Sequence, residues 1–127
     1  MECLFCKILD EKKKEFIYDN ASFYSFYDPY PVSKGHALII PKRHVNSFVG
    51  LDNKEQSDLF DALKKVMEFV NEKYHFSGYN IGINNGEVAG QTIMHLHLHF
   101  IPRYGGDVQN PKGGVRNVIP EKGDWGE

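Results

Sequence analysis

Three histidines occupy alternate positions in the segment His95-Leu96-His97-Leu98-His99. Strand side chains point to opposite faces at every second residue, so a strand over residues 94–101 would place the three imidazoles in one row, about 6.6 Å apart. The apolar residues between and beside them would then face a core: Met94, Leu96, Leu98 and Phe100. Histidine is neither a strong strand former nor a common core residue, so this row indicates a functional site.

Imidazoles beside a glycine-rich turn are suited to chemistry at phosphorus. A neutral imidazole can attack phosphorus, while a neighbouring imidazole assists the departure of the leaving group. The segment Gly90-Gln91-Thr92 leads into the histidines and can bring backbone N–H groups and polar side chains close to an anion. The middle residue, His97, is the natural candidate for the attacking group, although spacing alone does not assign the roles. The alternative is a surface strand or an adventitious metal site.

Two cysteines raise a second possible site. Cys3-Leu4-Phe5-Cys6 has the spacing of a zinc knuckle, and a tetrahedral zinc ion would need two more ligands from elsewhere in the chain. The alternative is a pair of buried thiols, because free cysteine behaves as a small hydrophobic residue.

The hydrophobic periodicity predicts an α+β fold with an antiparallel sheet of about five strands, one long helix and one short helix. A capping box at Asp52 and Glu55 opens a long helix over residues 53–74. A short helical turn is expected over residues 3–9, and the predicted strands cover residues 16–19, 22–27, 37–41, 79–83 and 94–101. Residues 1–105 are expected to form one domain, with residues 106–127 as a glycine- and proline-rich C-terminal tail or arm.

Composition limits the partners and the location. A formal net charge of -2 over 127 residues gives no support for nucleic-acid binding. No apolar run approaches the ~18 residues of a membrane helix, and no signal-peptide pattern is present, so we expect a cytoplasmic protein that does not bind membranes. No pattern calls for an organic cofactor.

Two segments of the chain resemble the histidine triad superfamily of nucleotide hydrolases and transferases. The first, residues 84–101, ends in the signature His-x-His-x-His followed by two apolar residues. The second, residues 28–44, reads Asp-Pro-Tyr-Pro-Val-Ser-Lys-Gly-His-Ala-Leu-Ile-Ile-Pro-Lys-Arg-His. The resemblance covers roughly residues 3–105, and the two motifs together are far more specific than a lone glycine pattern.

The resemblance implies a role for each histidine of the phosphate site. His97 matches the nucleophile that forms a nucleotidyl-histidine, and His99 matches the residue that contacts the phosphate and helps the leaving group. His36 matches a histidine that supports the triad from behind through hydrogen bonds. Read without the family, His36 could equally be a satisfied core histidine.

The resemblance also implies the residues that hold the nucleotide. Asn84, Gln91 and Thr92 match the polar positions around the phosphate oxygens. Asp28 matches the position that grips the ribose hydroxyls, which suits a carboxylate that accepts two O–H donors. Without the family, Asp28 before Pro29 would be read as a turn residue.

Zinc-bearing members of the superfamily supply the two ligands that the cysteine pair lacks. Their histidines match His44 and His95, so the resemblance implies a structural zinc at Cys3, Cys6, His44 and His95. Four protein ligands would leave no open position, and the ion would therefore not activate water.

The expected function is hydrolysis at the α-phosphate of dinucleoside polyphosphates or nucleoside phosphoramidates, with release of a nucleoside monophosphate. The expected ligand is a purine nucleotide or dinucleotide. The segment Arg103-Tyr104-Gly105-Gly106-Asp107 resembles the dinucleoside-polyphosphate hydrolases and favours them slightly.

Two alternative functions remain open. The first is a nucleotidyltransferase, although close transferase relatives carry glutamine at the position of His99. The second is a nucleotide-binding scaffold protein with little turnover. The resemblance also implies a homodimer, while Arg116 and Trp125 in the tail receive no assignment.

Overall fold

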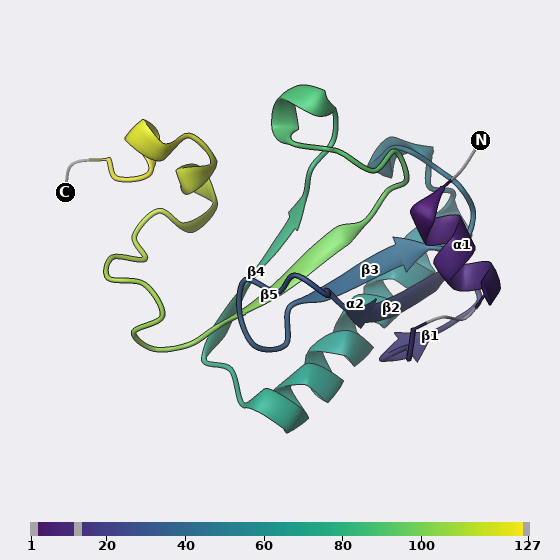
Figure 1. Cartoon of the computed structure of the whole chain (residues 1–127), viewed down its shortest axis with the longest axis horizontal. Helices are drawn as coiled ribbons and strands as arrows, with labels where there is room; N and C mark the ends of the chain where they lie inside the picture. The colour runs from purple at the N-terminus through teal and green to yellow at the C-terminus, as the bar shows by residue number, and fades with distance from the viewer. Residues whose placement is uncertain (1–2, 12–13, 126–127) are drawn as a thin grey trace.

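The structure, a computed structural model that describes residues 3–11 and 14–125, contains a five-stranded antiparallel sheet in the order β1-β2-β3-β5-β4 (Figure 1). Its elements are α1 (Leu4–Glu11), β1 (Tyr18–Asp19), β2 (Phe23–Tyr27), β3 (Ala37–Pro41), α2 (Asn53–Tyr74), β4 (Gly78–Ile83) and β5 (Leu98–Arg103), with the short 3-10 turns η1 (Phe48–Gly50), η2 (Glu87–Ala89), η3 (Gly114–Val118) and η4 (Pro120–Lys122). The predicted α+β fold, with one long and one short helix, is confirmed.

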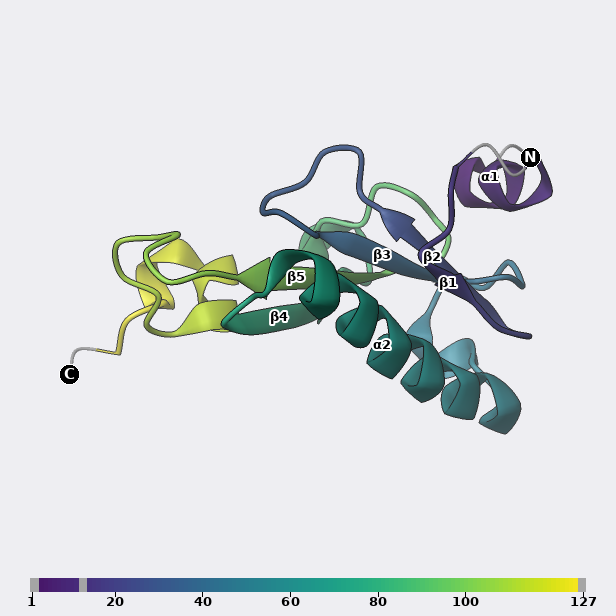
Figure 2. The same cartoon turned by 90° about the horizontal axis from the view of Figure 1, so that it is seen from below.

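The long helix α2 covers one face of the sheet. Its buried residues recur at helical spacing, as the sequence predicts for an amphipathic helix, and they include Leu59, Val66 and Val70. They pack against strand residues such as Ile39 and Phe100 to form the main core. Figure 2 shows α2 on one side of the sheet and α1 on the other.

The short helix α1 covers the opposite face. Alternate residues of β2 and β3 point toward it, so Phe26 and Leu38 form a second apolar cluster with Phe5 and Ile8 of the helix. The hydroxyl of Tyr24 donates a 2.6 Å hydrogen bond to the carbonyl oxygen of Phe5. These contacts hold α1 against the sheet. The face of the sheet that α1 covers also carries the candidate site.

The start of α2 also anchors the segment that follows β3. The Glu55 N–H donates to the Asp52 side chain, and the Asp52 N–H donates back to the Glu55 carboxylate, so the predicted capping box is confirmed. Arg43 donates two hydrogen bonds to the same carboxylate and a third to the carbonyl oxygen of Gly50. The backbone that carries His44 is thereby tied to the end of a helix.

The histidine strand begins later than the sequence indicates. Strand β5 starts at Leu98, and His95 and His97 lie in an irregular segment before it. The fully buried ring of His95 donates from Nε2 to the carbonyl oxygen of Pro41 at 2.8 Å, where backbone pairing with β3 would otherwise continue. Met94 is 44% exposed and does not join the core, in contrast to the prediction. The other predicted core residues of this segment are buried: Leu96, Leu98 and Phe100.

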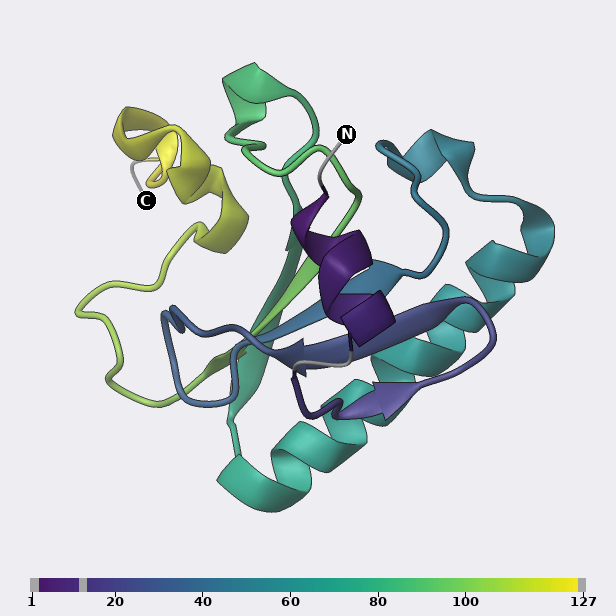
Figure 3. The same ribbon diagram turned by 45° about the vertical axis from the view of Figure 1, so that its right-hand side comes forward.

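The tail that follows β5 contains η3 and η4, and η3 lies beside β4 (Figure 3). The side chain of Trp125 lies close to two cations, with Lys112 Nζ 4.7 Å and the Arg116 guanidinium carbon 5.3 Å from its ring centroid. Residues 126 and 127, which belong to the predicted tail, lie outside the described residues. Within the described residues, none of the helices could cross a membrane.

Removal of the helix cap should destabilise the chain. We expect Asp52→Ala to lower the free energy of unfolding by about 1 kcal/mol, because one N-terminal N–H of α2 loses its acceptor. Urea denaturation measures the change. Glu68→Ala, an exposed position on the same helix, is the control and should change the free energy by less than about 0.5 kcal/mol. Equal losses in the two variants would contradict the role of the cap.

Candidate active site

A hollow of about 510 Å³ on the α1 face of the sheet collects most of the predicted nucleotide-binding residues. Its lining includes Asp28, Asn84, Gly90, Thr92, His97 and His99. Apolar side chains also line it, among them Leu4, Phe5, Ile8, Phe26 and Leu38, and so does Lys14. This combination of one apolar wall and a few convergent polar groups is typical of a small-molecule site.

The ring orientation of His97 is set by the backbone. Its Nδ1 lies 2.8 Å from the carbonyl oxygen of His95, an acceptor only, so Nδ1 carries the proton and donates. In the neutral ring, the second nitrogen, Nε2, then holds the lone pair, and the ring lines the hollow. A neutral imidazole with a fixed, unprotonated nitrogen is a competent nucleophile.

A chain of hydrogen bonds fixes the proton on His99. The Val32 N–H donates to Nδ1 of His36 at 3.1 Å, which leaves the His36 proton on Nε2. That Nε2 lies 3.0 Å from Nδ1 of His99 and donates to it, so the remaining proton of His99 is on Nε2. His36 therefore forms the supporting hydrogen bond that the resemblance implies.

His36, which is buried, and His99, which is half-buried, are held in their neutral forms. Burial lowers the pKa of His99 to about 4, and nearby His36 and His97 add to this effect. Burial also lowers the pKa of His36, partly offset by the carboxylate of Asp28, whose Oδ2 lies 3.5 Å from His36 Nε2. At neutral pH, His99 is thus an uncharged hydrogen-bond donor.

Asp28 follows strand β2, whereas Asn84 and Thr92 both lie in the loop between β4 and β5. Asp28 follows Phe26 by two residues. Its Oδ1 accepts the N–H of Tyr30 at 2.8 Å, so Asp28 is also the turn residue that its position before Pro29 predicts. Gly90 has φ = 97°, a left-handed conformation that suits glycine, and it lies next to the amide of Asn84. Both Asp28 and Asn84 border the hollow.

Gln91 does not border the hollow, unlike the other predicted nucleotide-binding residues. Its side chain is buried. Its amide oxygen accepts the Gly86 N–H at 2.9 Å, and its amide nitrogen donates to Asn46 and to the carbonyl oxygen of Ile93. The side chain therefore braces the loop, because every one of its polar groups is engaged within that loop and its neighbour.

The four predicted metal ligands lie together beside this hollow. Nδ1 of His95 lies 3.3 Å from the sulfur of Cys3, 3.6 Å from the sulfur of Cys6 and 3.2 Å from Nδ1 of His44, and the Cys6 sulfur lies 3.4 Å from that His44 nitrogen. A tetrahedral zinc ion separates sulfur and nitrogen ligands by roughly 3.5 Å and two nitrogen ligands by roughly 3.3 Å. The donor set therefore fits such an ion.

The proton on His95 supports the same conclusion. Nε2 of His95 donates to the carbonyl oxygen of Pro41, so its Nδ1 is unprotonated and faces the two sulfurs and His44. One lone pair cannot satisfy three separate donors, whereas a shared central ion accounts for all three distances. A backbone acceptor on the far ring nitrogen is also what metal-bound histidines usually have.

A second cluster, Asp28, His36 and His99, is a poor metal site despite its close spacing. A metal at Nε2 of His36 would require the proton to move to Nδ1. That proton would then oppose the Val32 N–H, which already points at Nδ1. The cluster is better described as a hydrogen-bonded support for His99.

The apolar wall of the hollow was missed at the sequence level. Phe5 lies between the two cysteines, and its ring centroid is 5.0 Å from that of His97 and 5.8 Å from that of His95. Phe26 shares a strand face with Asp28, two residues away, and this alternation is a signal that could have identified it. The hydrogen bonds from Arg43 to Glu55 join residues 12 positions apart, and no pattern in the sequence indicates them.

Comparison with known proteins places these features in one family. The HIT domain model matches residues 10–106. An uncharacterized HIT-like protein of Methanocaldococcus jannaschii is 42% identical over 118 residues, which cover 91% of each chain. An adenosine 5′-monophosphoramidase of Candida albicans is 35% identical over 106 residues, which cover 80% of this chain and 70% of that protein.

A solved structure supports the same assignment. The zinc-bound histidine triad family protein of Mycobacterium smegmatis matches with a TM-score of 0.76 and 32% identity, over 87% of this chain and 81% of that one. Sequence and fold therefore agree, and the chain belongs to the HIT family.

Proposed function

We propose that the protein hydrolyses nucleoside phosphoramidates at the α-phosphate through a nucleotidyl intermediate on His97. The observation that carries this proposal is the hydrogen bond from His97 Nδ1 to the His95 carbonyl oxygen, which in the neutral ring leaves the lone pair on Nε2. The phosphoramidase activity in the name of the Candida albicans relative favours a P–N bond over a polyphosphate as the bond that is broken.

The proposed reaction has two steps. In the first, the lone pair of His97 Nε2 forms a bond to phosphorus, the P–N bond breaks, and the leaving nitrogen takes up a proton from water. In the second, water attacks phosphorus and loses a proton, and His97 departs as a neutral imidazole. One difficult displacement is thereby divided into two easier ones.

The neighbouring groups would position the substrate and stabilise the added charge. The Nε2–H of His99 donates to the reacting phosphoryl group without introducing a charge of its own. Asn84 and Thr92 supply further donors, while Asp28 accepts hydrogen bonds from ribose hydroxyls. Gln91 acts through the loop, because its amide is engaged with Gly86 and Asn46.

The Cys3, Cys6, His44 and His95 cluster is proposed to hold a structural zinc ion. When bound, zinc would supply a fixed link between helix α1 and the segment that leads to His97. All four positions would be filled by protein, so no water would be activated there. The four-ligand geometry of this chain and its similarity to the zinc-bound Mycobacterium smegmatis protein support the proposal.

A homodimer remains an expectation from the resemblance. Strand β4 is the last strand of the sheet, and its outer side pairs with no other strand of the described residues. An unpaired strand edge is compatible with association between two copies.

Replacement of the nucleophile should stop turnover but not binding. We expect His97→Ala to reduce release of AMP from adenosine 5′-phosphoramidate by at least roughly 10³-fold, because no other group can form the intermediate. AMP release is followed by chromatography and AMP binding by calorimetry. His75→Asn, at the left-handed C-cap of α2, is the control and should retain full activity.

Three outcomes would contradict the proposal. Turnover by the His97→Ala variant at the wild-type rate would remove His97 from the reaction. Binding of AMP by a wild-type protein that releases no AMP would indicate the scaffold alternative. AMP transfer to an added phosphate acceptor in place of water would indicate a nucleotidyltransferase.

Loss of one cysteine should release the metal. We expect Cys6→Ala to lower the zinc content from about one ion per chain to a small fraction of that value, because three ligands bind zinc more weakly than four. Metal analysis measures the content, and thermal unfolding with and without a chelator measures its contribution to stability. An unchanged zinc content would place the ion elsewhere, and His75→Asn again serves as the control.

The stability of the chain should depend on the neutral form of His99. The pKa of His99 is about 4 in the folded chain and about 6.5 when unfolded, so the unfolded chain binds more protons between these values. This contribution to the free energy of unfolding is therefore complete above about pH 6.5 and is lost as the pH falls toward 4. We expect the loss between pH 7.5 and pH 5, measured by urea unfolding, to be smaller in His99→Gln than in the wild type. The metal ligands are common to both proteins, so their titration cancels, and an equal loss would contradict a neutral buried His99.

A further inference from the structure

The two cysteines lie together at the start of helix α1. The helix begins at Leu4, and the carbonyl oxygen of Cys3 accepts a hydrogen bond from the N–H of Lys7 at 3.0 Å, so Cys3 is the N-cap residue. Cys6 is then the third residue of the helix, and its N–H donates to the sulfur of Cys3 at 3.4 Å. The helix start therefore brings the side chain of one cysteine into contact with the other.

The positions of the two cysteines allow a disulfide between them. Their sulfur atoms belong to a set of four ligand atoms that all lie within 4.8 Å of one another. Residues three apart in helical geometry have Cα atoms about 5 Å apart, which is within the range that a disulfide spans. Cys-x-x-Cys is also the spacing of redox-active cysteine pairs. The sulfur atoms can therefore be joined with little movement of the backbone.

A hollow of about 530 Å³ lies beside the cysteine cluster and borders two of its four members, Cys3 and His44. His44 is exposed and both cysteines are half-buried, so His95 is the enclosed member of the four. Met94, which is 44% exposed, lines the same hollow. A small uncharged solute can therefore reach Cys3 through this hollow.

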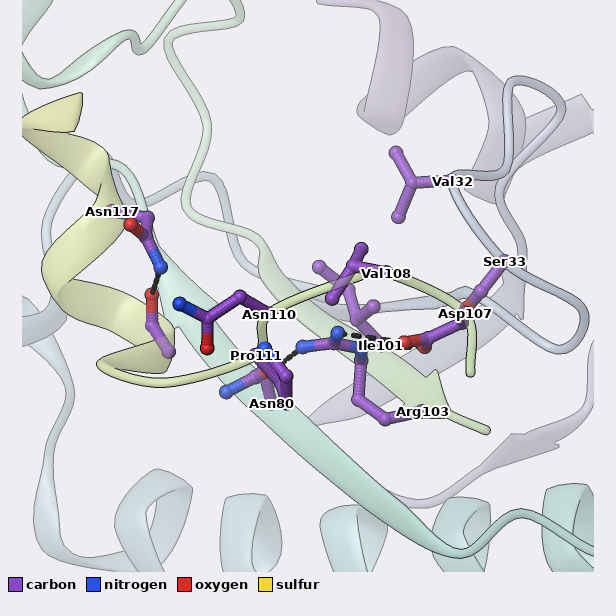
Figure 4. A pocket seen from close by; sticks show the side chains of 11 residues that line it. Val32, Ser33, Asn80, Ile101, Arg103, Asp107, Val108, Asn110, Pro111 and Asn117 are labelled. Atoms are coloured by element: carbon purple, nitrogen blue, oxygen red, sulfur yellow. Dashed lines mark hydrogen bonds and ion pairs between the residues drawn. The ribbon is translucent and has the colours of Figure 1, made fainter. Parts of the chain in front are cut away.

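The hollow of about 510 Å³ near the end of β5 is different in kind (Figure 4). Its cation is Arg103, which donates through Nε and Nη2 to the carboxylate of Asp107 and through Nη1 to Asn80. Among the described residues, its lining contains neither cysteine nor methionine. Of these two hollows, the one beside the cysteines offers sulfur to a solute.

From these observations we propose that Cys3 and Cys6 form a redox-modification site, at which a hydroperoxide converts the pair into a disulfide and causes the release of zinc. This inference rests on the metal site that is proposed above and is independent of the hydrolytic reaction. Its co-reactant is a small uncharged peroxide, such as hydrogen peroxide, which the hollow beside Cys3 can admit.

The proposed oxidation has two steps and begins from thiolates, the form in which cysteine binds zinc. In the first, the Cys3 sulfur attacks one oxygen of the peroxide, the O–O bond breaks, and the hydroxide that leaves takes up a proton from water. The sulfur is then a sulfenic acid. In the second, the Cys6 sulfur attacks the Cys3 sulfur, the S–O bond breaks, and the hydroxide takes up a second proton. Two electrons pass from the sulfur pair to the peroxide, which yields two water molecules.

The disulfide would remove two of the four metal ligands. Thiolate is the form of cysteine that binds a metal, and neither sulfur of a disulfide is a thiolate. His44 and His95 would remain, and two ligands hold zinc much more weakly than four. Oxidation of the pair and loss of the ion would therefore occur together, and reduction by a dithiol would restore the site.

The experiment exposes the zinc-loaded, full-length chain to hydrogen peroxide. A chromogenic chelator measures the released zinc, and alkylation followed by mass spectrometry counts the free thiols. We expect about one zinc ion per chain to be released as both thiols are lost, with a decrease in mass of about 2 Da. Dithiothreitol followed by added zinc should restore both the thiols and the metal content.

Two variants identify the sulfur atoms that react. Cys6→Ser lacks the second sulfur, so Cys3 should gain oxygen, with an increase in mass of about 16 Da or more, instead of losing hydrogen. Met94→Leu is the matched control, because Met94 lines the same hollow and can itself be oxidised. This control should release zinc at a rate within about twofold of the wild type.

Three results would overturn the inference. The first is oxidation of Met94 while both cysteines remain thiols, and the second is retention of zinc after both thiols are lost. The third is a wild-type chain that purifies without zinc and cannot be loaded with it, which would overturn the proposed metal site as well. Zinc release with disulfide formation, in a wild type that releases no AMP from a phosphoramidate, would support this inference and overturn the proposed reaction.

Discussion

The hydrogen bond from the His97 ring to the carbonyl oxygen of His95 is the interaction on which the active site depends. Of the two neutral tautomers of His97, this hydrogen bond selects the one with the lone pair on Nε2. The acceptor belongs to the backbone of His95, a residue whose own side chain is held in place. The His95 ring is fully buried, donates to the Pro41 carbonyl oxygen and faces the cysteine cluster. The proposed metal site at the four Cys and His ligands would therefore orient the proposed nucleophile without touching the nucleotide.

The sheet makes this arrangement possible by separating its two faces. One face packs on α2 and supplies most of the apolar core, so the other face can carry histidines without loss of that core. Helix α1 then covers part of the second face, and its Phe5 contacts both His95 and His97. The same helix therefore contributes to the second apolar cluster, the cysteine pair and the wall of the hollow.

The sequence predicts the features that depend on local pattern. The bounds of α2, the capping box and the strand at Ala37–Pro41 follow from periodicity and turn chemistry, and the structure confirms them. The start of β5 could not be predicted, because the residues before it bond to distant partners, as the His95 ring does to the carbonyl oxygen of Pro41, 54 residues away. The position of Gln91 was unpredictable for the same reason, since Asn46, 45 residues away, accepts its side-chain hydrogen bond. Residue type indicates that a polar group is needed, whereas the tertiary fold decides which partner it meets.

The positions of the ring protons follow from the way the histidines are joined. In the neutral form of each ring, one partner decides which nitrogen carries the proton: a carbonyl oxygen for His95 and for His97, and an N–H group for His36, which in turn sets His99. Burial adds to this by disfavouring any extra proton on His36 and His99. The ring of His99, whose centroid lies 5.4 Å from that of His97, is therefore an uncharged donor at neutral pH and adds no positive charge beside His97. In the proposed reaction, charge would be introduced by the phosphate of the nucleotide, and donors that are already in place would reduce the reorganisation that the reaction requires.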